Sequence, residues 1–248
     1  MIRIEDVYKS IDGNAIIRGA SLDVARGEVL TLIGKSGIGK SVLLKHIPGL
    51  IKPDRGRITI NGTDIGRLSN RELMKMRRQI GFLFQGGALF DSMTVYDNVA
   101  FPLRENSKIK EEAIREKVMD GLLQVGLTGA EEKYPAELSG GMKKRAALAR
   151  ELIWEPEIML FDEPASGLDP IMRNAILHLI KKLHERLRFT GILVSHEIPQ
   201  VFEITDRVAM LHDGVITAVG TPEEILSSAN PIVNQLIKGD REGPISVH

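Results

Sequence analysis

Eight residues near the start of the chain carry the pattern of a phosphate-binding loop. Residues 34–41 read GKSGIGKS, which matches G-x-x-x-x-G-K-[ST] and follows an apolar run at 28–33. Glycines let backbone N–H groups face phosphate oxygens, and the N-terminus of the following helix adds positive potential. The sequence therefore predicts a triphosphate site formed by Gly34, Lys35, Ser36, Gly37, Ile38, Gly39, Lys40, Ser41 and Val42, with Lys40 on the β- and γ-phosphates and Ser41 on Mg²⁺.

A pair of carboxylates follows a second apolar run. Residues 157–163 read EIMLFDE, so Asp162 and Glu163 stand at the end of an expected strand. Asp162 is placed to hold Mg²⁺, and Glu163 is placed to accept a proton from an attacking water, which typically contributes 10²–10⁴-fold to a rate. A solvated acidic turn is the alternative, and the phosphate-binding loop upstream argues against it.

A third segment is expected to bind an anion at a helix N-terminus. Residues 138–142 read LSGGM, where Ser139 can cap the helix and Gly140 and Gly141 leave its first N–H groups uncovered. An ordinary capped helix would have the same pattern.

Alternating strands and helices are expected to position these segments. Strands are predicted near residues 2–7, 28–33, 57–60, 63–65, 80–84, 157–161, 191–195, 207–211 and 215–219, and helices at 110–127, 139–153, 169–187, 221–224 onward and 230–239. We expect an α/β fold with a mixed sheet core, an antiparallel β subdomain and an inserted α-helical subdomain at about residues 88–155. Residues 1–228 would form one domain, followed by a C-terminal helix and tail at 229–248, with Asp240–His248 expected to be loose.

Composition excludes several classes of protein. Lys plus Arg equals Asp plus Glu at 33 each, which predicts no strong non-specific attraction to nucleic acid. The chain has no cysteine, so disulfides and thiolate metal sites are excluded. We find neither a signal-peptide core at Met1–Asp6 nor a run of about 18 apolar residues, so we expect a soluble, unsecreted chain that would need another subunit to span a membrane.

Six motifs in order make the sequence resemble the ATP-binding subunits of ATP-binding-cassette (ABC) transporters, over residues 2–228. They are residues 34–41, Gln85, residues 138–142, Asp162 with Glu163, residues 166–169 and His196. The resemblance implies the P-loop ABC-ATPase fold and a head-to-tail homodimer with two ATP molecules between the subunits. Ser139, Gly140 and Gly141 of one chain would then contact the γ-phosphate held by the other.

The resemblance also implies roles for single residues. Gln85 would ligate Mg²⁺ and sense a transmembrane permease, His196 would hydrogen-bond the γ-phosphate, and Asp169 would cross the dimer interface. Two positions depart from the family pattern. Met142 replaces the usual glutamine, and the adenine-stacking aromatic falls near the aliphatic Ile11, so Tyr8 is the candidate substitute.

The signature segment is similar to that of one group within the family, the ATPases of Mce-type phospholipid transporters. Residues 138–150, 83–90 and 98–105 resemble that group, and residues 239–244 resemble its C-terminal arm. This implies a permease, a periplasmic Mce-type lipid-binding subunit, and a place on the cytoplasmic face of the inner membrane. Residues 143–145, read KKR, are expected to form a solvated basic turn.

Three alternatives remain open. The chain could serve another ABC transporter, for nutrients or solvent resistance. A non-transport ABC protein of ribosomes or DNA repair is a second possibility, although the chain shows no second cassette and no coiled coil. A P-loop kinase or GTPase would leave residues 138–142 unexplained, and no Asn-Lys-x-Asp guanine motif is present.

Overall fold

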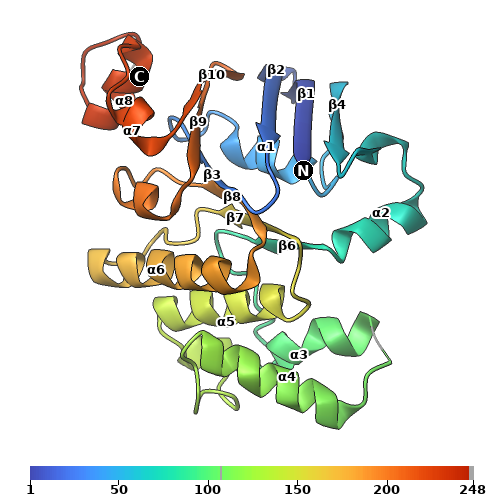
Figure 1. Ribbon diagram of the computed structural model, residues 1–248. Helices are drawn as coiled ribbons and strands as arrows, with labels where there is room; N and C mark the ends of the chain where they lie inside the picture. The colour runs from blue at the N-terminus through green and yellow to red at the C-terminus, as the bar shows by residue number, and fades with distance from the viewer. Residues whose placement is uncertain (107, 246–248) are drawn as a thin grey trace. The chain divides into compact units, whose positions relative to one another are not determined.

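The computed structural model describes residues 1–106 and 108–245, with only the backbone of Asn106. The chain forms two compact units (Figure 1). The first comprises Met1–Met76 and the chain from Thr190 onward, and the second comprises Arg77–Phe189.

An antiparallel sheet in the first unit has the order β2-β1-β4-β5, formed by β1 (Ile2–Ile11), β2 (Asn14–Val24), β4 (Arg55–Ile60) and β5 (Thr63–Asp64). The apolar side chains at Ile2, Ile4 and Val7 of β1 are buried, as the sequence pattern predicts. The turn between β4 and β5 has positive φ angles of 50° at Asn61 and 80° at Gly62. Asn-Gly tolerates this geometry, and the hairpin expected there is confirmed.

The remaining strands of the first unit run in the order β10-β9-β3-β8. Three are parallel, namely β3 (Val29–Ile33), β8 (Thr190–Val194) and β9 (Arg207–His212), and β10 (Val215–Gly220) pairs with β9 as a hairpin. Every residue of β3 and β8 is buried, as expected for strands covered on both faces. The helical elements of this part of the chain are α1 (Lys40–His46), η1 (Ile65–Arg67), α2 (Asn70–Arg77), η3 (Gln200–Ile204), α7 (Pro222–Leu226) and α8 (Pro231–Lys238).

The second unit combines two parallel strands with a group of helices. The strands are β6 (Ile80–Leu83) and β7 (Ile158–Asp162). The helices are α3 (Val95–Asn106), α4 (Glu111–Gln124), η2 (Pro135–Glu137), α5 (Gly140–Leu152) and α6 (Pro170–Leu187). Helix α4 buries Ile114, Val118 and Leu122, which recur at helical spacing, and α3, α4 and α5 pack on one another.

The C-terminal tail differs from the sequence prediction. Residues 240–245 are not loose but fold back on α8, because the buried Gln235 amide donates to the carbonyl oxygens of Asp240 (3.2 Å) and Ile245 (3.1 Å). The Ile245 N–H in turn donates to Gln235 Oε1 at 2.6 Å. Residues 246–248 of the predicted tail lie outside the described residues, and the division at residue 228 stays a prediction.

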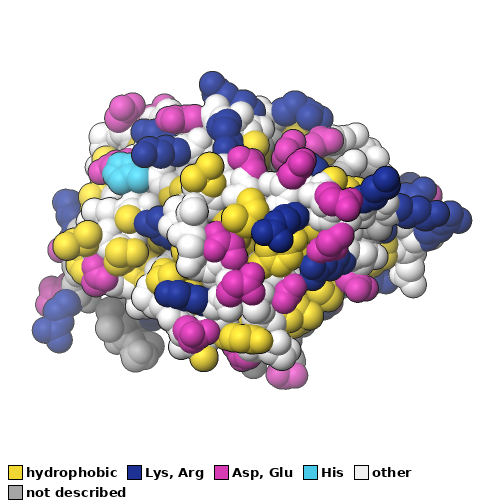
Figure 2. All heavy atoms as spheres, turned by 90° about the horizontal axis from the view of Figure 1, so that it is seen from below, with side chains coloured by type: hydrophobic (Ala, Val, Ile, Leu, Met, Phe, Trp, Pro, Cys, Tyr) yellow, Lys and Arg dark blue, Asp and Glu magenta, His cyan; other side chains and the backbone are white. Residues whose placement is uncertain are grey.

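Acidic, basic and apolar side chains are interspersed on the face that Figure 2 shows, in keeping with the balanced charge of the chain. Within residues 1–106 and 108–245, no helix has both the length and the apolar character needed to cross a bilayer.

Candidate nucleotide-binding and catalytic site

The phosphate-binding loop connects the buried strand β3 to helix α1, and two of its glycines have no room for a side chain. A Cβ atom at Gly34 would lie 2.4 Å from the Leu211 carbonyl oxygen. At Gly39, where φ is 106°, a Cβ atom would lie 2.6 Å from Ile16 Cγ2. The loop therefore requires glycine for both space and backbone angle.

Lys40 is buried inside this loop, with 4% of its surface exposed. Its ammonium group donates hydrogen bonds to the carbonyl oxygens of Gly34 (2.8 Å) and Lys35 (2.9 Å). The loop thus curves around a positive charge, while Lys35, Ser36 and Gly37 are exposed to solvent. This arrangement suits a polyphosphate, whose oxygens would meet both the ammonium group and the exposed surface of the loop.

His196 lies at the same edge of the first unit's sheet as this loop. Strands β3 and β8 are parallel and in register from Val29 opposite Gly191 to Leu32 opposite Val194. Their carboxyl ends are therefore adjacent, and Gly34 and the exposed His196 follow those ends. Ligands of parallel sheets bind outside the carboxyl ends of the strands.

The two adenine-stacking candidates, Tyr8 and Ile11, are both in β1 and are 41% and 38% exposed. The Tyr8 hydroxyl lies close to Gly19 of β2, where an added Cβ would be 2.9 Å from Oη. Exposure is therefore similar at the two positions, and Tyr8 alone offers an aromatic face for stacking.

The second unit brings Gln85 and Glu163 together. They follow the parallel strands β6 and β7, which are in register from Ile80 opposite Ile158 to Leu83 opposite Phe161. Gln85 Nε2 donates a hydrogen bond to Glu163 Oε2 at 3.0 Å. Asp162, the last residue of β7, is buried, and Glu163 has a left-handed φ of 49°. A left-handed φ is uncommon for a residue other than glycine, asparagine or aspartate.

The glycines of residues 138–142 pack closely against Leu168, in the loop before α6, and against Met172, in the first turn of α6. Ser139 caps α5 by accepting a hydrogen bond from the Met142 N–H at 3.3 Å. A Cβ at Gly141 would lie 2.5 Å from Met172 Cε, and one at Gly140 would lie 3.2 Å from Leu168 Cδ2. Asp169 caps α6 by accepting from the N–H groups of Ile171 and Met172 at 3.0 and 3.1 Å.

Sequence reasoning missed two buried basic residues of α5. Lys144 is 8% exposed, its ammonium group donates to the Gln85 carbonyl oxygen, and burial lowers its pKa. Arg150, also 8% exposed, donates to the carbonyl oxygens of Ala88 (2.7 Å) and Gly87 (3.0 Å). The sequence signal for the burial of Lys144 was its helical spacing: it precedes Ala147 and Leu148 by three and four positions, so it lies on the same buried face of α5.

The prediction of a solvated basic turn at residues 143–145 is therefore wrong for Lys144. It is also wrong for Arg145, which is only partly exposed and donates to the Val125 carbonyl oxygen at 3.1 Å. Lys143 remains half-exposed.

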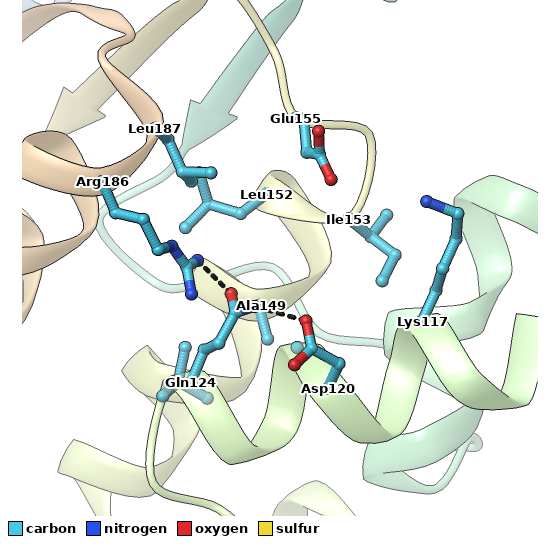
Figure 3. Close-up of a pocket in the computed structure, with 11 residues that line it drawn as sticks. Lys117, Asp120, Gln124, Ala149, Leu152, Ile153, Glu155, Arg186 and Leu187 are labelled. Atoms are coloured by element: carbon cyan, nitrogen blue, oxygen red, sulfur yellow. Dashed lines mark hydrogen bonds between the residues drawn. The ribbon is translucent and has the colours of Figure 1, made fainter.

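The predicted site residues divide between the two units. The first holds residues 34–42, His196 and Tyr8, and the second holds Gln85, Ser139, Gly140, Gly141, Asp162 and Glu163. A cavity of about 270 Å³ among α4, α5 and α6 contains none of them (Figure 3). There Arg186 donates to the Gln124 amide oxygen, and the Gln124 amide nitrogen donates to Asp120. The cavity is separate from the candidate site.

A glycine loop around a buried lysine, a carboxylate pair at a strand end and a second capped helix N-terminus define an ATP-binding protein of the P-loop class. The family model described as ABC transporter matches residues 17–166. The chain therefore belongs to the ABC transporter family, and it is an ATPase of that family. The resemblance expected from the motifs is confirmed.

Similar proteins extend the match to almost the whole chain. One is the intermembrane phospholipid transport system ATP-binding protein MlaF of Haemophilus influenzae, 44% identical over 245 residues that make up 99% of this chain and 93% of that protein. Another is the probable ribonucleotide transport ATP-binding protein mkl of Mycobacterium leprae, 45% identical over 246 residues that make up 99% of this chain and 71% of that protein.

Solved structures confirm the predicted ABC-ATPase fold. CbiO1 of Clostridium perfringens, part of the ABC transporter complex cbiONQ, has a TM-score of 0.84 and 33% identity, covering 92% of this chain and 90% of that one. The ATP-binding cassette MJ0796, in a dimeric post-hydrolysis state with ADP and Pi, has a TM-score of 0.82 and 31% identity, covering 90% of this chain and 99% of that one.

Proposed function

We propose that the chain is the ATP-driven motor subunit of a phospholipid transporter that moves lipids between two membranes. The observation that carries this proposal is the 44% identity to MlaF, which spans 99% of this chain and 93% of that protein. ATP binding would close a dimer of two copies and move a permease, and hydrolysis would reset it.

The active unit in this proposal is a head-to-tail homodimer. Residues 34–41 of one copy would hold the triphosphate, and Ser139, Gly140 and Gly141 of the other would contact its γ-phosphate. The helix N-terminus at Ser139 supports this role, because uncovered N–H groups and the helix dipole attract anions. The dimeric state of the similar cassette MJ0796 also supports it.

Mg²⁺ is the expected metal, with ligands from Ser41, Asp162 and Gln85. A hydroxyl, a carboxylate and an amide oxygen are hard donors, and Mg²⁺ usually takes one or two carboxylates together with substrate phosphates. The residues that the structure describes form no cluster of three or more His, Cys, Asp or Glu side chains suited to a metal. The proposed set contains a single carboxylate, so nucleotide phosphates and water would complete the coordination of the ion, which would neutralise charge on the transferring phosphoryl group.

Glu163 is proposed as the general base that accepts a proton from the attacking water. The Gln85 amide, 3.0 Å from the Glu163 carboxylate, would fix the direction of that carboxylate and contact the water or metal. Lys40 would stabilise the β- and γ-phosphates, and His196 would donate a hydrogen bond to the γ-phosphate. Tyr8 is proposed to stack on adenine.

The proposed partners are a transmembrane permease and, in the same complex, a periplasmic Mce-type lipid-binding subunit. The chain would then be peripheral on the cytoplasmic face of the inner membrane. The second candidate cargo is a ribonucleotide, because the relative mkl, which is 45% identical, is described as a probable ribonucleotide transport ATP-binding protein. Phospholipid is favoured because the match to MlaF covers 93% of that relative, against 71% of mkl.

The test is to purify the tagged chain from membranes with its permease and to measure ATP turnover and lipid transfer in proteoliposomes. We expect turnover that depends on phospholipid, and fluorescent phospholipid transfer that stops in a matched complex with Glu163→Gln. Turnover that responds to ribonucleotides and not to phospholipids would assign the mkl-type cargo instead.

A further inference from the structure

One buried lysine links the helix that begins at Ser139 to the proposed catalytic pair. Lys144 lies in the second turn of α5, and its ammonium group donates to the backbone carbonyl of Gln85, 59 positions earlier in the chain. The side chain of the same Gln85 donates to Glu163, 78 positions later. The three residues form a continuous line of hydrogen bonds within the second unit.

The electrostatics agree with this line of contacts. Burial is the main cause of the lowered pKa of Lys144, and the Glu163 carboxylate acts in the opposite direction. A carboxylate can do this only when its charge reaches the ammonium group, so the lysine and the proposed base lie in a common local field.

A second side chain of α5 bonds the same segment, two and three residues beyond Gln85. The guanidinium of Arg150 donates to the carbonyl oxygens of Gly87 and Ala88. Both residues have left-handed φ angles, of 76° and 49°, so their carbonyl groups are turned out of a regular strand or helix. Lys144 is the nearer of the two anchors to the proposed site, because it bonds Gln85 itself.

We propose that Lys144 is a positioning residue for ATP hydrolysis, which holds the backbone of Gln85 so that the Gln85 amide stays bonded to Glu163. The inference rests on the function proposed above for Gln85 and Glu163. Catalytic groups need support from a surrounding shell, since a misplacement of about 1 Å can lower a rate by 10²-fold. Because α5 also begins at Ser139, a shift of this helix would carry Gln85 with it.

The test compares three variants in the complex purified with its permease. Lys144→Met removes the donor while keeping a long apolar stem, and we expect kcat to fall about tenfold with KM for ATP within about twofold. Lys144→Arg keeps a buried donor and should recover most of kcat. Lys143→Met is the matched control, because it removes the same charge from a partly exposed neighbour that has no proposed role in the site, and it should leave turnover unchanged.

A double-mutant cycle separates positioning from general loss of structure. In a Gln85→Ala background, Lys144→Met should add no further loss, because the amide that it positions is already gone. Additive losses, or wild-type turnover in Lys144→Met, would overturn the proposal. If Lys144→Met melts below the assay temperature, Lys144→Ala, which also lacks a side-chain donor, takes its place in the same cycle with the same expected outcomes.

Glu163→Gln in the same complex shows whether a negative result removes only the positioning role of Lys144 or also the proposed function. Loss of turnover in Glu163→Gln with normal turnover in Lys144→Met would remove only the positioning role. Normal turnover in Glu163→Gln would remove the catalytic scheme on which that role rests.

Discussion

The two units hold their parts of the site by different means. In the first, Lys40 bonds carbonyl oxygens only five and six positions away, and the loop is shaped by its own glycines. In the second, Gln85 is held by residues 59 and 78 positions distant. The phosphate-binding loop is thus a local structure, whereas the catalytic pair depends on packing between α5, β6 and β7. Substitutions far in sequence from both the phosphate-binding loop and the catalytic pair should therefore lower turnover more than they weaken nucleotide binding.

The largest effect that would test this contrast is expected from Ser139→Arg. A long cation at this N-cap removes the bond to the Met142 N–H and fills the surface proposed to meet the γ-phosphate. We expect turnover to be abolished while a single copy keeps its affinity for ATP, measured by fluorescent nucleotide titration. Loss of affinity in the monomer would show that this helix contributes within one chain and would break the comparison.

Glu163→Gln should have the next largest effect. The amide keeps the size of the side chain but cannot accept the proton, so kcat should fall at least about 100-fold. ATP binding and ATP-dependent dimerisation should remain, measured by size-exclusion chromatography with light scattering. Glu157→Gln, at the other end of the same apolar run, is the control and should keep wild-type turnover. Turnover near wild type in Glu163→Gln would remove this residue from the role of base.

Arg150→Met should mainly affect stability. It removes the donors to Gly87 and Ala88 and leaves the carboxylate of Glu151, 3.1 Å from Arg150, without its cation. Because 20% of the Glu151 side chain is exposed, we expect the free energy of unfolding to fall by about 2 kcal/mol, less than for a fully buried pair, as measured by urea unfolding. Burial raises the pKa of Glu151, so this carboxyl is more readily protonated in the folded state. The loss should therefore shrink as the pH falls, and an unchanged loss at pH 5 and pH 8 would contradict this account.

The smallest effect is expected from a substitution of His46, the last residue of α1, the helix that follows the phosphate-binding loop. It is fully buried, its Nδ1 lies 2.6 Å from the Val42 carbonyl oxygen, and burial lowers its pKa below the usual 6.5. The unfolded chain therefore binds a proton more readily, and wild-type stability should decline as the pH falls below 6.5. His46→Leu should weaken this decline, measured by thermal melts from pH 7.5 to 5. An equal decline in both proteins would assign the titration elsewhere.

Much of the fold follows from short-range patterns. The structure has the Asn61-Gly62 turn and the Asp169 cap where their residue types predict them. It also has the predicted capping box, in which the Thr221 N–H donates to Glu224 Oε2 at 2.8 Å and the Glu224 N–H donates to Thr221 Oγ1 at 3.2 Å. The sequence reading did not identify β2 or α2. Helix α2 buries none of its residues, so it has no full apolar face by which to recognise it.

The sequence by itself determined the family, the ATPase class and the phosphate-binding loop, because glycine spacing, strand ends and helix caps act over a few residues. Tertiary structure alone decided that Gln85 contacts Glu163, that Lys144 and Arg150 are buried, and that Gln235 holds the chain near Ile245. The physical reason is that an isolated lysine or glutamine has no preferred partner. Only the folded chain brings a particular carbonyl or carboxylate within reach of these side chains, and it removes water from Lys144, Arg150 and Gln235.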